Sequence, residues 1–214
     1  ASDVYKRQPL PWQTPCGAMA HSPSLLLDYY RFASETTVEF HREQVEIIRA
    51  HCPNHFVTHN MMGLHDTLDY YALARDLDFV SWDNYPATTA ALPHDLMRGV
   101  LGKNFWVMEQ KSGHTGWNRM SRSPRPGQLR CWAWQAVGHG ADAVVFFRWR
   151  SCRFGTEQFW QGILNHDGRP GRRYEEVARF ARELRQFSDE LEGTRPQNQV
   201  AVLHSYEQCW ALAI

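Results

Sequence analysis

Apolar residues occur along the chain in two arrangements: short continuous runs, and longer segments in which they recur at helical spacing. The short runs end in polar residues. The run from Phe105 to Met108, followed by Glu109, is typical of a strand buried on both faces of a parallel sheet. We predict such strands over residues 55–60, 79–83, 105–110 and 143–148, with a further one over 199–203.

The longer segments predict helices that alternate with these strands. They cover residues 34–51, 66–77, 93–101, 126–139 and 173–192, and a short helix or turn is expected over 24–34. In the first of the long helices a Thr36-x-x-Glu39 pair resembles a capping box. In the last, the apolar residues lie on one side and Gly193 ends the helix.

This alternation predicts an α/β fold with a parallel sheet and helices outside it. Four strand–helix units correspond to half of a (β/α)8 barrel, or TIM barrel, and a half barrel leaves two sheet edges and an apolar face uncovered. We therefore expect a fragment, or a chain that needs a partner. Residues 1–8 have no initiator Met and no periodic pattern and are expected to be a non-native leader. Residues 9–196 would form the half barrel, and 197–214 the start of a second, truncated α/β domain.

Composition narrows the function without identifying it. The 214 residues are 43% hydrophobic, enough for a sizeable core, and 23 basic side chains balance 23 acidic ones. The sequence has no basic stripe that would indicate nucleic-acid binding and no apolar run as long as a membrane span. Its five cysteines are never spaced as C-x-x-C, which predicts reduced, buried thiols and no disulfide framework.

Polar residues gather at the predicted C-terminal ends of the strands, where parallel barrels carry their chemistry. These residues are Asn60, Asp83, Asn84, Tyr85, Glu109, Arg148 and Arg150, and Trp117 and Glu157 follow in the next loops. Carboxylates serve as nucleophile and acid/base in glycoside hydrolysis, and flat aromatic side chains stack on the apolar face of a sugar. A sugar site is one interpretation of this pattern, and a structural rim of hydrogen-bonded polar groups is the alternative.

Six short segments occur together and in a characteristic order. They are residues 23–29 (PSLLLDY), 80–86 (VSWDNYP), 107–110 (VMEQ), 124–127 (PRPG), 139–142 (HGAD) and 146–150 (FFRWR). Taken together they resemble the glycoside hydrolase family 42 β-galactosidases, over a region from about Pro9 to the C-terminus. None of the segments would suffice alone.

The resemblance implies a (β/α)8 barrel that hydrolyses terminal non-reducing β-D-galactosides with retention, by double displacement and with two glutamates. Glu109 matches the nucleophile, at the end of the family's seventh strand. The family's acid/base follows an Asn at the end of the fourth strand, whereas the strands here resemble strands 5–8. Because the sequence contains no Asn-Glu dipeptide, we expect the acid/base to be absent from this chain and the chain alone to be inactive.

The resemblance also implies four substrate-binding residues. Tyr85 matches a tyrosine close to the nucleophile, and Trp117 matches a tryptophan that packs against galactose. Glu157 matches a glutamate that binds galactose hydroxyls. Three residues later the family usually has a histidine that shares this work, where this chain has Trp160. That departure leaves open a related retaining glycosidase with a different sugar preference.

The sequence and the resemblance also lead to expectations about metals, cofactors and partners. The densest group of metal-binding residue types, His51-Cys52-x-x-His55, lacks a second cluster, so no metal or cofactor is expected from this chain. Some family members hold a structural zinc with cysteines from a region before this segment. The resemblance implies a β-galactoside substrate, no nucleic-acid or membrane partner, a homotrimeric full-length enzyme and a bacterial cytoplasmic location. A non-catalytic sugar-binding or assembly protein is a further alternative, against which Glu109 in its nucleophile motif argues.

Overall fold

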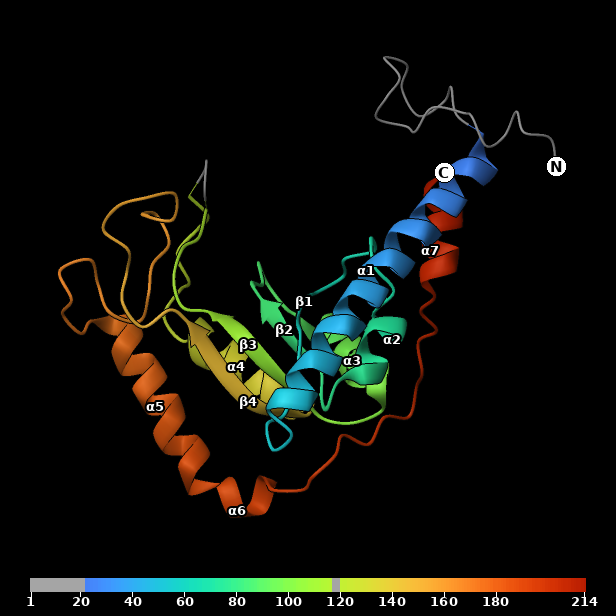
Figure 1. The fold of residues 1–214 in the computed structure, drawn as a ribbon. Coiled ribbons are helices and arrows are strands. Elements are labelled where there is room, and N and C mark those ends of the chain that lie inside the picture. Colours follow the sequence, from blue (N-terminus) through green and yellow to red (C-terminus); the bar gives the residue numbers. More distant parts are fainter. Residues whose placement is uncertain (1–21, 117–119) are drawn as a thin grey trace, which may run out of the picture. The chain divides into compact units, whose positions relative to one another are not determined.

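The structure is a computed structural model that describes residues 22–116 and 120–214 (Figure 1). It consists of two compact units, which we describe separately. One unit combines the described part of residues 1–53 with 65–73 and 203–214. The other, which carries the sheet, combines 54–64 with the described part of 74–202.

The second unit is built on a four-stranded parallel sheet. Its strands are β1 (Asn60–Met62), β2 (Ser81–Asn84), β3 (Phe105–Lys111) and β4 (Ala141–Phe147), and their order in the sheet is the order in the sequence, as Figure 1 shows. The predicted α/β fold with a parallel sheet is confirmed. The C-terminal ends of all four strands lie at one edge, because parallel strands point the same way.

Helices lie between these strands and after the last of them. They are η4 (Ala74–Asp76), α3 (Ala91–Leu101), α4 (Gln128–Gly138), α5 (Arg172–Gln186) and α6 (Ser188–Leu191). On α3 the buried His94 stacks on Phe105 of β3 at 5.5 Å between ring centroids, and it meets Trp82 of β2 edge-on at 4.9 Å. Phe105, Val107 and Leu129 of α4 are completely buried, so the core lies between the sheet and these helices.

The other unit is helical. Its elements are α1 (Pro23–His51), α2 (Tyr70–Leu73) and α7 (Tyr206–Ala213). Tyr206 meets Tyr70 and Tyr71 edge-on, each at 5.8 Å between ring centroids. Arg31 of α1 pairs with Glu207 of α7 at 2.6 Å. Aromatic packing and this ion pair therefore join three segments that are far apart in the sequence.

Several element boundaries differ from the prediction. The short helix expected over 24–34 and the helix expected over 34–51 are one helix, α1, so the predicted capping box is wrong. Thr36 lies inside the helix and its hydroxyl donates to the Phe32 carbonyl oxygen at 2.9 Å. The helix predicted over 66–77 is two short pieces, α2 and η4, and the one over 173–192 breaks at Phe187 between α5 and α6.

The strand predicted over 55–60 begins only at Asn60. Its earlier residues are held by side chains: Val57 N donates to Asp78 Oδ2 at 2.7 Å, and Thr58 Oγ1 donates to the Phe79 carbonyl oxygen at 2.8 Å. These side-chain bonds take the place of a regular backbone ladder. The segment therefore lies beside Asp78 and Phe79, just before β2, without forming a strand.

The strand predicted over 199–203 is wrong, because this segment is irregular. A strand requires a neighbour that pairs with its backbone groups. None of the strands in the described ranges lies beside this segment, and Val200, Val202 and Leu203 are exposed.

The cysteines are only partly as predicted. The four within the described ranges are free thiols, but Cys52 and Cys131 are exposed and not buried; Cys16 lies outside those ranges. No helix among the described residues is long and apolar enough to cross a membrane.

Candidate active site

Glu109 lies two residues before the C-terminal end of β3. Its partner across the ladder on β2 is Asp83, whereas Val107 pairs with Trp82. β3 therefore carries one extra residue, Met108, at this point. Such a bulge interrupts the alternation of side chains along the strand and can re-aim the side chain that follows it, which is why bulges are common beside active sites.

Tyr85, the residue that follows β2, holds the Glu109 carboxylate. Its hydroxyl donates to Glu109 Oε2 at 2.6 Å. Burial raises the pKa of Tyr85, and the bond to Glu109 raises it further because loss of the proton would place two negative charges together. The Tyr85 hydroxyl is therefore a stable donor that stabilises negative charge on Glu109.

A second hydrogen bond between the same strands keeps this pair in place. Asn84 Nδ2 donates to Gln110 Oε1 at 2.9 Å, and both side chains are buried. Since buried amides need hydrogen-bond partners, this contact selects one alignment of the strand ends. It fixes the position of Tyr85 relative to Glu109, since each is the neighbour of one bonded residue.

Asp83 adds another carboxyl group beside Glu109. Burial is the main cause that raises the pKa of Asp83 to about 7, the charge of Glu109 adds to it, and a hydrogen bond from Asn60 opposes it. Asp83 Oδ1 is buried and has no hydrogen-bond partner among the described residues. Glu109 therefore has a neighbour that takes up a proton near neutral pH.

Glu157 lies in the loop that follows β4, where Arg148 pairs with it through a hydrogen bond from Nη2 to Oε2. The Arg148 guanidinium lies over the Phe147 ring, with Cζ 4.8 Å from the ring centroid. The negative charge of Glu157 contributes to the raised pKa of Tyr85, so Glu109 and Glu157 both act on the same hydroxyl group. Glu157 is thus held in a charge-neutral pair.

Trp160 is buried, at 9% exposure, and its ring contacts residues at the C-terminal ends of β2 and β4. Its ring meets Tyr85 edge-on at 5.1 Å between centroids and Phe147 edge-on at 5.7 Å. The next residue ties this loop to the loop after β3, because Gln161 N donates to the His114 carbonyl oxygen at 3.0 Å. The loops approach closely at Gly113, where a Cβ would lie 2.3 Å from Gln161 Cβ.

The structure brings four of the five predicted site residues into one connected network. Tyr85 bonds to Glu109 and packs against Trp160, and the charge of Glu157 acts on Tyr85. Trp117 lies outside the described residues. Their individual roles stay predictions, because contacts within the protein do not show what a substrate touches.

Three further residues of this network were not predicted as site residues: Asp83, Phe147 and Arg148. Asp83 and Arg148 stood among the polar strand ends, but nothing in the sequence indicated their partners. Arg148 and Glu157 are nine residues apart, and only the fold of the intervening loop brings them together. The paired positions Asp83 and Glu109 become neighbours only once the register of the ladder is known.

Among the described residues, no group of three or more His, Cys, Asp and Glu side chains is arranged to hold a metal ion. The His51-Cys52-x-x-His55 segment therefore forms no such group. Glu109 and Glu157 instead accept hydrogen bonds from Tyr85 and Arg148, respectively.

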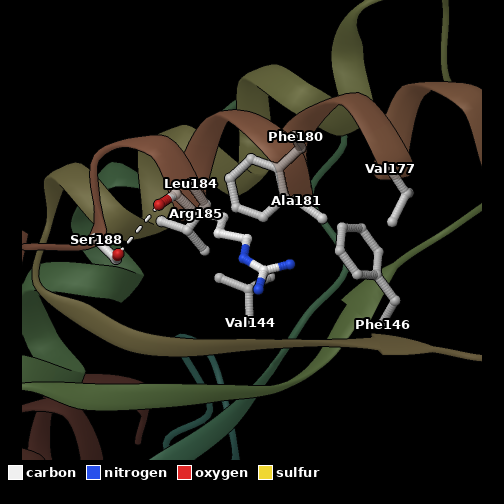
Figure 2. Close-up of a pocket in the computed structure, with 8 residues that line it drawn as sticks. All are labelled: Val144, Phe146, Val177, Phe180, Ala181, Leu184, Arg185 and Ser188. Atoms are coloured by element: carbon white, nitrogen blue, oxygen red, sulfur yellow. Dashed lines mark hydrogen bonds between the residues drawn. The ribbon is translucent and has the colours of Figure 1, made fainter.

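An apolar cavity of about 430 Å³ lies elsewhere in this unit, between β4 and α5 (Figure 2). It is lined by Val144, Phe146, Val177, Phe180, Ala181, Leu184, Arg185 and Ser188. Phe146 faces this cavity, and successive side chains of a strand point to opposite faces, so Phe147 and the network around it lie on the other face. The cavity lining contains no carboxylate, the group that glycoside hydrolysis requires.

Comparisons with known proteins identify relatives of this chain. The model of glycoside hydrolase family 42, described as beta-galactosidase, matches residues 5–187. The beta-galactosidase BgaA of Clostridium cellulovorans is 44% identical over 204 residues, which cover 90% of this chain and 31% of the relative. A beta-galactosidase of Thermus thermophilus is 43% identical over 211 residues, covering 88% of this chain and 32% of the relative.

Solved structures give the same result. A beta-galactosidase from the psychrophilic Marinomonas ef1 superposes with a TM-score of 0.88 at 31% identity, covering 97% of this chain and 36% of that one. A beta-galactosidase from Bacillus circulans sp. alkalophilus has a TM-score of 0.84 at 35% identity, covering 92% and 31%. The chain thus spans about a third of the length of these relatives. With its parallel sheet, its strand-end glutamate and this match over most of its length, the chain belongs to the glycoside hydrolase family 42 β-galactosidases.

Proposed function

We propose that this chain is part of an enzyme that hydrolyses terminal non-reducing β-D-galactosides with retention of configuration, and that Glu109 is the nucleophile. The observation that carries the proposal is the hydrogen bond from Tyr85 to Glu109 at the C-terminal end of a parallel sheet, in a family whose members are named beta-galactosidases. The chain would supply strands 5–8 of a (β/α)8 barrel, and residues 197–214 would begin the next domain.

In the proposed mechanism, the Glu109 carboxylate attacks the anomeric carbon of the galactoside. The bond from that carbon to the leaving oxygen breaks, and a galactosyl ester of Glu109 forms. A second carboxyl group, from a segment outside this chain, gives its proton to the leaving oxygen. It then removes a proton from the water that cleaves the ester; in retaining enzymes the two groups are about 5 Å apart.

The other residues of this chain bind and orient. Tyr85 donates to Glu109 and keeps one carboxylate oxygen fixed while the other attacks. Glu157, held by Arg148, accepts hydrogen bonds from galactose hydroxyls, and Trp117 packs against the sugar ring. The full-length enzyme would be a homotrimer in the bacterial cytoplasm.

A mechanism-based label tests this proposal in the full-length polypeptide that carries the segment. A 2-deoxy-2-fluoro-β-galactoside with a good leaving group should glycosylate the nucleophile with loss of that leaving group, and the resulting glycosyl ester should hydrolyse only slowly. Mass spectrometry of a digest should then find the deoxyfluorogalactosyl group on the peptide that contains Glu109, and Glu109→Gln should take up none. A label on another carboxylate, or hydrolysis with inversion of the anomeric centre, would overturn the assignment.

The substrate class and the missing carboxylate need separate assays. A panel of nitrophenyl glycosides should show the highest kcat/KM for the β-galactoside, and a clear preference for another sugar would contradict that part of the proposal. The chain alone should turn over none of them. Activity should appear when the chain is mixed with a polypeptide that supplies the preceding half of the barrel.

A further inference from the structure

We propose that Trp160 is a positioning residue, which holds the Tyr85 ring so that its hydroxyl stays on the nucleophile, and that it is not a contact of the sugar. The proposal deepens the proposed function and relies on it for the role of Glu109. Three features of the structure support it: the burial of the indole, its two edge-on contacts, and the anchoring of its backbone.

The burial of Trp160 leaves little of its ring for a ligand. A side chain that stacks on a sugar must present an open face, whereas Trp160 is only 9% exposed. In the same loop Trp149 is 61% exposed and Phe154 is 79% exposed, so the loop has aromatic rings open to solvent, and Trp160 is not one of them. Its surface is instead used by contacts within the protein.

Those contacts lead to Glu109. The indole meets the Tyr85 ring at 5.1 Å and 82°, and Tyr85 donates to Glu109 Oε2 at 2.6 Å. Edge-on aromatic pairs at this separation are favourable beyond the area they bury. Rotation about the Cα–Cβ bond of Tyr85 would swing the hydroxyl away from its acceptor, and the indole packed against the ring restricts that movement.

On its other side, Trp160 packs against β4. It meets Phe147 at 5.7 Å and 85°, and Phe147 in turn carries the Arg148 guanidinium on its ring. Arg148 pairs with Glu157, whose carbonyl oxygen accepts a hydrogen bond from Trp160 N at 2.9 Å. The contacts close a ring, so the position of Trp160 is set by the same residues that hold Glu157.

The backbone beside Trp160 is also held. Ser112 Oγ donates to the Gln161 carbonyl oxygen at 2.9 Å, and Gln161 N donates to the His114 carbonyl oxygen at 3.0 Å. Gly162 fits against the chain after β4, where a Cβ would lie 2.7 Å from the Arg148 carbonyl oxygen. Trp160 is therefore a fixed support for Tyr85, and the loop after β4 acts on a nucleophile carried by β3.

The first test observes Tyr85 directly, in this chain and without activity. In protein labelled with ¹³C-tyrosine, the Tyr85 ring signals are identified by their loss in Tyr85→Phe. Trp160→Ala should shift these signals and speed the ring flips of Tyr85, whereas Trp160→Phe, which keeps an aromatic edge, should largely restore them. Trp132→Ala is the matched control: Trp132 is also buried, at 4% exposure, but its Nε1 donates to the Thr88 carbonyl oxygen. Unchanged Tyr85 signals in folded Trp160→Ala would overturn the proposal.

The second test measures kinetics in the full-length polypeptide. Trp160→Ala should lower kcat by about tenfold to a hundredfold, the range expected for loss of a hydrogen bond to a charged group, with little change in KM. Tyr85→Phe should have a similar effect, and the double variant should be no worse than Tyr85→Phe alone. A raised KM with unchanged kcat, additive with Tyr85→Phe, would mean that Trp160 contacts the substrate. A nucleophile other than Glu109 would end the proposed function, but the Tyr85 signals would still decide whether Trp160 positions that ring.

Discussion

Glu109 and Glu157 lie in two regions of the same unit, one in a strand and one in a loop, and they are held in different ways. The strand carboxylate accepts a hydrogen bond from the neutral Tyr85, whereas the loop carboxylate is paired with the cation Arg148. A neutral donor orients a carboxylate and leaves its charge in place, while a guanidinium cancels the charge and occupies an oxygen. The difference fits a nucleophile at Glu109 and a hydroxyl acceptor at Glu157.

The two regions also differ in the structural features that hold each carboxylate in place. Glu109 is placed by a strand, a bulge and the Asn84–Gln110 hydrogen bond, all of which belong to the sheet. Glu157 is placed by a loop. The ion pair with Arg148 and the close backbone approaches at Gly113 and Gly162 hold this loop in place. Substitutions at the first region should therefore affect chemistry, and those at the second should affect binding.

The largest effect is expected for Glu109→Gln in the full-length polypeptide. Loss of the nucleophile removes the covalent route, so kcat for an aryl β-galactoside should fall roughly 10³-fold or more. Steady-state kinetics and a thermal unfolding curve should show an inactive but folded protein. Near-normal turnover would contradict both the assignment and the comparison with Glu157.

A smaller effect is expected for Glu157→Gln. The amide accepts hydrogen bonds less strongly than a carboxylate and leaves Arg148 without its ion partner, so KM should rise about tenfold while kcat changes less. Arg148→Lys, which keeps the positive charge, serves as the control and should fall between the variant and the wild type. If Glu157→Gln lost as much kcat as Glu109→Gln, the two carboxylates would share one role.

The sheet that supports both carboxylates should weaken in acid because of His94. The pKa of His94 is lowered to about 3, mainly by burial and also by the charge of His139, while Asp95 opposes the shift. The unfolded chain takes up a proton near pH 6.5 while the folded chain does not, so stability falls as the pH drops from about 6.5 towards 3, by at most about 1.4 kcal/mol per pH unit.

Urea denaturation of the chain at several pH values measures this slope. His94→Phe, which keeps a ring in contact with Phe105 and Trp82, should flatten it. An equally steep slope in His94→Phe would assign the acid sensitivity to other groups.

The smallest effect is expected for Asp83→Asn. Because the folded-state pKa of Asp83 is raised to about 7, the folded chain keeps a proton that the unfolded chain releases near pH 4. Its contribution to stability is present at low pH and is lost as the pH rises through about 7. Asp83→Asn should therefore gain stability relative to the wild type between pH 4 and 7, by less than about 1.4 kcal/mol per pH unit because the group is partly exposed. A pH-independent difference in urea denaturation would show that folding does not shift the pKa of Asp83.

Prediction from sequence was accurate where local pattern and burial agree. The strand at Phe105 ends at Lys111, one residue from its predicted end, and α3 and α4 lie within two residues of their predicted bounds. In these segments the spacing of the apolar residues and their burial indicate the same structure. Prediction failed where the structure depends on more than the local pattern. Thr36 lies inside α1 and does not begin a helix. Residues 199–203 have strand-forming side chains but no neighbouring strand among the described residues.

The residue types of the candidate site, the parallel α/β fold and, through motif order, the family could all be predicted from the sequence. Which of these residues meet became known only from the folded chain. A bulge places Glu109 opposite Asp83, a loop returns Glu157 to Arg148, and Trp160 packs against Tyr85 across 75 positions of the chain. Periodic burial is a local property that a pattern of side chains encodes, whereas a hydrogen bond between distant residues depends on strand register and loop packing, which no single segment contains.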